Sequence, residues 1–94
     1  MTMQPSYRAD FEAALFKYPG PGGWHFVRVP EDVAPRATHA WGRTPVRATV
    51  DGITWDTSVW REQSGRTLLA VPKRVRGSKG DGDQVAVTIA FDAL

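Results

Sequence analysis

The 94-residue sequence contains no cysteine and no asparagine. Without cysteine, disulfide bonds, thiolate metal ligands and a cysteine nucleophile are all excluded. Without asparagine there is no acceptor for N-linked glycans. The chain also lacks an apolar run long enough to cross a membrane, and its first stretch, MTMQPSYRAD, lacks the apolar core of a secretory signal. These absences predict a soluble, cytoplasmic protein of bacterial type that has no membrane partner.

The net charge is small as well. Twelve basic and ten acidic side chains leave a formal charge of +2, which is weak evidence for a nucleic-acid partner. The only histidines, His25 and His39, show no metal-ligand spacing, so we expect no metal and no cofactor. Hydrophobic residues make up 41%, as in ordinary globular domains. The length predicts one domain over residues 1–94, with its core at about 8–92.

Frequent turn signals divide the chain into short segments with strand character. Six strands are predicted: 11–17, 24–29, 46–50, 53–60, 67–71 and 85–91. The last is the clearest, because apolar residues occupy every second position from Val85 to Phe91. Asp51-Gly52 suits a two-residue hairpin turn between the third and fourth strands. Short strands with many turns are typical of a small β-barrel.

Two segments, 30–41 and 72–78, lack strand character. Each opens with a proline, which the first helical position tolerates because its N–H would be unpaired there. We therefore predict one or two helical turns in each segment, as two short caps on the barrel.

The same two segments belong to an internal repeat. The pattern V-P-x-x-V occurs at 29–33 and again at 71–75, at identical spacing. Each copy leads to a strand with the same alternation, Val46-x-Ala48-x-Val50 in the first and Val85-x-Val87-x-Ile89 in the second. The repeat predicts a pseudo-twofold barrel made by one chain.

The segment VPKRVRGSKGDGDQVAV at 71–87 resembles the swapped-hairpin module of AbrB- and MazE-type transcription factors and antitoxins. Together with 11–15, GGWHFVRVPEDVA at 22–34 and WGRTPVRATVDG at 41–52, it makes the whole chain resemble the family of domain of unknown function 1905. The resemblance implies a mainly β fold, a six-stranded double-split β-barrel with two short helical caps. It brings no catalytic residues and no cofactor. We expect a monomer or weak dimer.

Four tryptophans in so short a chain suggest a binding surface. We predict an aromatic patch or shallow cavity for a small molecule or protein, built from Trp24, Trp41 and Trp60 with His25 and Arg28 nearby. The protein would then be a small binding or accessory module. The competing interpretation places the tryptophans in the core and at the barrel ends, because large aromatics supply much of a small core.

An alternative function is AbrB-like nucleic-acid binding. Four basic residues lie close together in the second repeat: Lys73, Arg74, Arg76 and Lys79. A symmetric DNA-binding barrel would carry such charge in both copies. The first copy instead has Glu31 and Asp32 where the second has Lys73 and Arg74, so the asymmetry disfavours this alternative.

A second alternative is a small enzyme that acts on a lipophilic metabolite by shape. No catalytic residue is predicted, since Ser58 and Ser64 lack the sequence context of an activated nucleophile. The sequence favours a binding protein over an enzyme.

Overall fold

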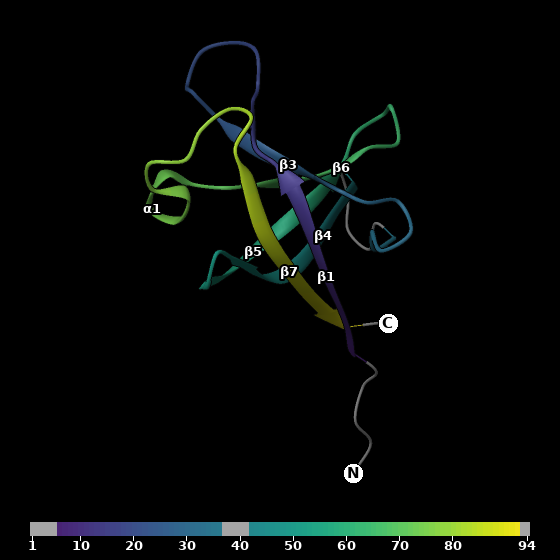
Figure 1. The fold of residues 1–94 in the computed structure, drawn as a ribbon. Helices are drawn as coiled ribbons and strands as arrows, with labels where there is room; N and C mark the ends of the chain where they lie inside the picture. Colours follow the sequence, from purple (N-terminus) through teal and green to yellow (C-terminus); the bar gives the residue numbers. More distant parts are fainter. Residues whose placement is uncertain (1–5, 37–41, 93–94) are drawn as a thin grey trace.

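The computed structural model describes residues 6–36 and 42–92 as a curled, seven-stranded antiparallel sheet with one short helix (Figure 1). The strands are β1 (Ser6–Ala14), β2 (Phe16–Lys17), β3 (His25–Val29), β4 (Arg43–Val50), β5 (Ile53–Arg61), β6 (Thr67–Ala70) and β7 (Gln84–Asp92), and the helix is α1 (Lys73–Arg76). Their order across the sheet is β1-β7-β4-β5-β6-β3-β2. In the described residues no helix has the length and apolarity needed to span a membrane.

The two edges of the sheet come from one stretch of chain. β1 and β2 lie at opposite ends of the strand order, yet only Leu15 separates them in sequence. The sheet must therefore curl until its edges approach each other, which produces a half-barrel. The Leu15 N–H donates to Asp83 O, and Leu15 O accepts from the Gly82 N–H, each at 2.8 Å.

The six-strand prediction is wrong at this point. The predicted strand 11–17 starts earlier, at Ser6, and is interrupted at Leu15, so it forms two strands. Leu15 bonds to the turn before β7, and the chain then passes from its pairing with β7 to its pairing with β3. Bending at that residue lets one segment serve both edges of the sheet.

The core lies on the concave side of the sheet, where every second strand residue points inward. The predicted inward residues of β4 and β7 are confirmed as buried except Phe91, which is half-buried, and Val75 of α1 joins the buried residues. The buried core cluster contains Leu15, Val27, Val29, Val46, Ala48, Val50, Val59, Leu69, Val71, Val75, Val85, Val87 and Ile89. Trp55 and Phe91 are half-buried and pack against this cluster.

The predicted hairpin between β4 and β5 is confirmed. Val50 pairs with Ile53 around a two-residue turn. Asp51 and Gly52 have φ values of +47° and +87°, which aspartate tolerates and glycine adopts freely.

Only one of the two predicted helical caps forms within the described residues. α1 follows Pro72 as expected. In the segment 30–41, the Val33 N–H reaches Pro30 O at 3.1 Å in a single turn, residues 34–36 are irregular, and 37–41 lie outside the described residues. The difference is Pro35. It has no N–H to donate to the Glu31 carbonyl, and it disfavours a helical Ala34.

Strand register places equivalent residues of the two repeats opposite each other. Val27 of β3 and Leu69 of β6 are direct register partners. Each lies two positions before the valine of a V-P pair. Thr49 of β4 and Thr88 of β7 are also direct register partners. They occupy matching positions in the two alternating strands. Each of these antiparallel strand pairs therefore joins one strand from each repeat at equivalent positions.

Candidate functional site

Four aromatic side chains cluster on the outer face of β2 and β3, away from the core. Phe26 is their centre: its ring centroid lies 6.1 Å from Phe16, 5.4 Å from Tyr18 and 6.5 Å from Trp24. Phe16 and Phe26 are direct cross-strand partners, while the neighbouring Val27 points inward. Trp24 is 61% exposed and Tyr18 40%. We call these four residues the aromatic cluster; they form a partly solvated apolar surface.

The turn PGPGG between β2 and β3 sets the position of Trp24. The Tyr18 N–H donates to Trp24 O at 2.8 Å and closes the turn. Gly22 has φ +99°, and a Cβ there would lie 3.0 Å from the indole Cδ1 and Nε1 of Trp24. The indole thus lies directly against the glycine backbone. A side chain at this position would push the indole aside, and the positive φ itself favours glycine.

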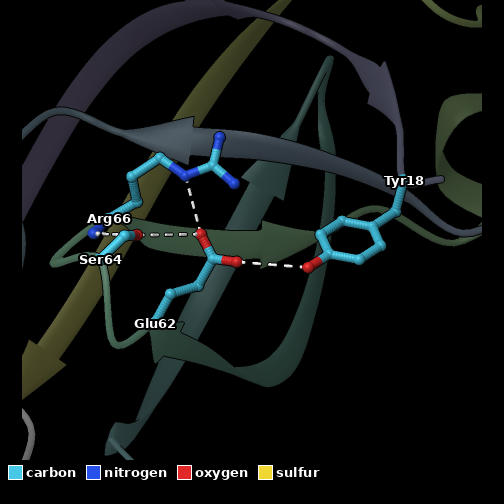
Figure 2. Close-up of polar contacts among 4 residues, drawn as sticks. All are labelled: Tyr18, Glu62, Ser64 and Arg66. Carbon is cyan, nitrogen blue, oxygen red and sulfur yellow. Dashed lines mark hydrogen bonds and ion pairs between the residues drawn. The ribbon is translucent and has the colours of Figure 1, made fainter.

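A polar network joins this cluster to the loop between β5 and β6 (Figure 2). Arg66 Nε donates to Glu62 Oε1 at 2.7 Å, and Tyr18 Oη donates to Glu62 Oε2 at 3.4 Å. Ser64 Oγ lies 3.5 Å from Glu62 Oε1. The Arg66 guanidinium also lies 5.7 Å from the Phe16 ring centroid, a cation–π contact. The loop therefore contacts two residues of the aromatic cluster, Tyr18 through Glu62 and Phe16 through Arg66.

The same network controls the charge of Glu62. The hydrogen bond from Arg66, together with its positive charge, lowers the pKa of Glu62 below its ordinary value, and Tyr18 and Ser64 add smaller contributions. Glu62 is therefore a carboxylate at neutral pH and neutralises Arg66. A carboxylate paired in this way is suited to hold the loop in place rather than to exchange protons.

A second feature of the outer face crosses four adjacent strands. Arg43 pairs with Trp60, Trp60 with Leu68, and Leu68 with Arg28. Direct cross-strand partners lie on the same face of a sheet. We call these four residues the Trp60 row. Arg43 lies 6.0 Å from the Trp60 ring centroid, and Trp60 is 43% exposed.

Leu68 in this row is unusual, because it lies outside the core cluster and yet is only 4% exposed. Its neighbour Leu69 supplies the inward side chain of β6. Leu68 must therefore be covered by side chains of the outer face itself. The row and the aromatic cluster are continuous, since Arg28 and Phe26 are two residues apart on β3.

The predicted binding residues are partly brought together. Trp24, Trp60 and Arg28 share the outer face, and both tryptophans are exposed rather than part of the core. His25 is half-buried, alternates to the opposite side from Trp24, and its Nδ1 lies 2.7 Å from Gly23 O. Trp41 lies outside the described residues.

Sequence reasoning missed seven residues of this surface: Phe16, Tyr18, Phe26, Arg43, Glu62, Leu68 and Arg66. A signal existed for the three aromatics, because Phe16-x-Tyr18 and Trp24-x-Phe26 flank one glycine-rich turn, and each pair has the two-residue spacing that puts side chains on one face of a strand. No local signal marks the pair of Tyr18 and Glu62, which are 44 positions apart.

The predicted nucleic-acid residues mostly contact the protein itself. Lys79 Nζ donates to Asp51 Oδ2 and to Gln84 O, each at 2.8 Å. Arg76 Nη1 donates to Lys79 O at 3.1 Å, and the Arg74 guanidinium lies 6.0 Å from the Trp55 ring centroid. Lys73 is exposed. Three of the four basic side chains thus have structural contacts.

A separate groove of about 470 Å³ opens where β1 begins and β7 ends. Tyr7 and Phe91, direct partners across these strands, stack there at 5.6 Å. Val33, Pro35 and Thr44 form much of the opposite wall. Within residues 6–36 and 42–92, no three histidine or acidic side chains are grouped closely enough to hold a metal ion.

Comparison with curated proteins gives no match to this chain. One protein family, described as a domain of unknown function (DUF1905), has a sequence model that matches residues 11–89. The match runs from β1 into β7 and includes both repeats, and it confirms the resemblance seen in the sequence. The chain therefore belongs to the DUF1905 family.

Proposed function

We propose that the protein is a small, non-catalytic binding module that receives a protein partner on its outer face. The observation that carries this proposal is the exposure of Trp24 and Trp60 on one continuous surface. Tryptophan, tyrosine and arginine are the residues that contribute most often to protein–protein binding energy. The outer face supplies all three types.

The architecture of this surface suits a protein better than an enclosed small molecule. The aromatic cluster lies on a sheet face, while small-molecule sites are typically concave and bury most of the ligand. The Glu62–Arg66 pair keeps the β5–β6 loop beside the cluster, so the surface is organised before binding.

Small-molecule binding is a second candidate, and the groove beside Tyr7 and Phe91 favours it. Its volume falls within the usual range for ligand pockets. The groove shares no residue with the aromatic cluster or the Trp60 row, so variants of one can test it without altering the other. Nucleic-acid binding through Lys79 and Arg76 is less favoured, because both side chains already bond to neighbouring groups.

We also propose that the curled sheet is a double-split barrel with a pseudo-twofold axis. The self-equivalent pairs Val27–Leu69 and Thr49–Thr88 support it. The remaining strands fit the same symmetry. β1 pairs with β7 and β2 pairs with β3, and in the equivalent way β5 pairs with both β4 and β6. The β1–β2 segment and β5 therefore each pair with one strand from each repeat.

The proposed function is tested by selecting displayed random peptides on the immobilised protein and measuring the affinity of a selected peptide by calorimetry. Trp24→Ala and Trp60→Ala should each weaken its binding about tenfold or more, as expected for central interface aromatics. Both variants should remain folded with only a small loss of thermal stability, because each ring is partly exposed and lies outside the core cluster.

Tyr7→Ala is the matched control, since Tyr7 is an exposed aromatic (55%) that lies away from the outer face. It should bind the peptide as the parent does. Peptides that bind both tryptophan variants as tightly as the parent would contradict the proposal, as would a failure to enrich any peptide.

A further inference from the structure

The Trp60 row carries two positive charges that the described residues do not neutralise. Arg28 and Arg43 are both exposed. In the described parts of the chain, neither takes part in an ion pair with a carboxylate. All ten acidic residues of the sequence lie within those parts, so residues 1–5, 37–41 and 93–94 contribute no acidic side chain.

Other arginines near the outer face differ from these two. Arg66 is paired with Glu62 at 2.7 Å, and Arg47 with Asp56 at 3.0 Å. Arg61 reaches Glu31 at 3.4 Å. Arg28 and Arg43 therefore carry charge at the two ends of the Trp60 row that no described carboxylate neutralises.

The row also has a defined length. Arg43 and Arg28 lie on strands separated by three inter-strand steps, from β4 through β5 and β6 to β3. At about 4.8 Å per step, their backbones lie roughly 14 Å apart. An extended peptide advances about 3.3 Å per residue, so two side chains four positions apart are separated by roughly 13 Å.

The middle of the row is apolar. Trp60 and Leu68 stand between the arginines in the register. Trp60 is 43% exposed and Leu68 only 4%, so Trp60 supplies the accessible apolar surface. An apolar side chain placed against Trp60 would bury carbon against carbon, which is favourable, and would leave the two ends free for charged contacts. An arginine–carboxylate contact can then be bidentate, which adds directional specificity.

We propose that the partner segment is an extended acidic peptide that crosses the strands, with two carboxylates four residues apart and an apolar side chain midway between them. This inference rests on the proposed function and adds the chemistry of its ligand. A single-stranded nucleic acid is less suited to the row, because Arg43 already lies over the Trp60 ring and the next residue of the row, Leu68, is buried and offers no stacking platform.

The test uses the peptides selected on the intact protein. Enriched sequences should carry Asp or Glu at positions i and i+4 around an apolar residue. Replacing both acids by their amides should weaken binding at least tenfold, and affinity should fall as salt is raised from 50 to about 300 mM, since salt screens exposed charges.

On the protein side, Arg28→Gln is the primary variant, because it does not alter the Arg43–Trp60 contact. It should weaken binding at least fivefold and reduce the salt dependence. Arg47→Gln is the matched control, since Arg47 is also exposed but is already paired with Asp56; it should bind as the parent does. Circular dichroism confirms that each variant is folded.

The outcomes separate the two levels of the proposal. Enriched peptides that are neutral or basic, or that bind Arg28→Gln as tightly as the parent, overturn the acidic-ligand inference. If those peptides still lose affinity with Trp24→Ala and Trp60→Ala, the proposed function stands. A short single-stranded oligonucleotide that binds through Arg28 when no acidic peptide is enriched overturns the inference in favour of nucleic acid.

Discussion

At the scale of single residues, Gly42 shows how tightly the backbone can constrain a position. Its φ is +69°, and an added Cβ would lie only 2.6 Å from the carbonyl oxygen of Arg61. The residue precedes β4 and lies beside the end of β5. Both the left-handed conformation and the close strand contact therefore require glycine.

We expect Gly42→Ala to lower the free energy of unfolding by about 2 kcal/mol or more, because left-handed strain costs about 1–2 kcal/mol and the steric clash adds to it. Gly52→Ala is the control. Gly52 also has a positive φ, but a Cβ added there would meet no atom within 4 Å. Urea denaturation should show the smaller loss for Gly52→Ala, and equal losses in the two variants would argue against the clash.

Glu62 makes stability depend on pH. Its pKa is lowered in the folded protein, chiefly by Arg66, so folding favours its charged form. The stabilisation is complete above the pKa of the unfolded chain, near 4.3, and is lost as pH falls through the lower folded pKa. Unfolding measured from pH 7 to about pH 3 should therefore show a steeper loss for the parent than for Glu62→Gln. If the stability of the parent and of Glu62→Gln fell equally with pH, the Arg66 contact would contribute nothing to the free energy of unfolding.

At the scale of elements, Asp51 links the β4–β5 hairpin to the approach to β7. Its Oδ1 accepts from the Ala86 N–H at 2.9 Å, and its Oδ2 accepts from Lys79 Nζ at 2.8 Å. Lys79, then the Ala86 N–H, lower the pKa of Asp51. One side chain thus holds together a turn and a loop that are distant in sequence.

Asp51→Ala should destabilise the fold by about 1–2 kcal/mol, because the Ala86 N–H and Lys79 lose their acceptor. Asp51→Asn should cost less, since asparagine tolerates the left-handed conformation and keeps one oxygen acceptor. Thermal and urea unfolding of both variants test this order. A loss for Asn as large as for Ala would assign the effect to charge alone.

At the scale of the whole molecule, the outer face divides into two unlike halves. On β1, β7, β4 and β5, outward polar groups bond to one another: Thr88 donates to Asp10, Arg47 pairs with Asp56, and Thr49 bonds to Thr54. The second half comprises β2, β3 and β6 together with Arg43 and Trp60, which lie at the ends of β4 and β5 away from their hairpin turn. Its outward residues are mainly aromatic or aliphatic. The first half satisfies its own polar groups, while the second presents an apolar surface with arginines beside it, as interaction surfaces do.

The strands and the core were largely predictable because they depend on local patterns. Alternation from Val46 to Val50 and from Val85 to Ile89 identified the inward residues, and Asp51-Gly52 identified the hairpin. The break at Leu15 was not predictable, because it depends on bonds to Gly82 and Asp83 far along the chain. Pro35 was a visible signal against the first helix, and the opening proline alone was not enough to form one.

The sequence by itself determined which residues face the core, where the chain turns and how the two repeats align, because these follow from a period of two and from backbone preferences. Tertiary structure decided the outer face. Tyr18 meets Glu62, and Arg28 joins the Trp60 row, only once the sheet has curled and the strand register is established. Such contacts join residues from separate strands, and no local pattern specifies which strands become neighbours.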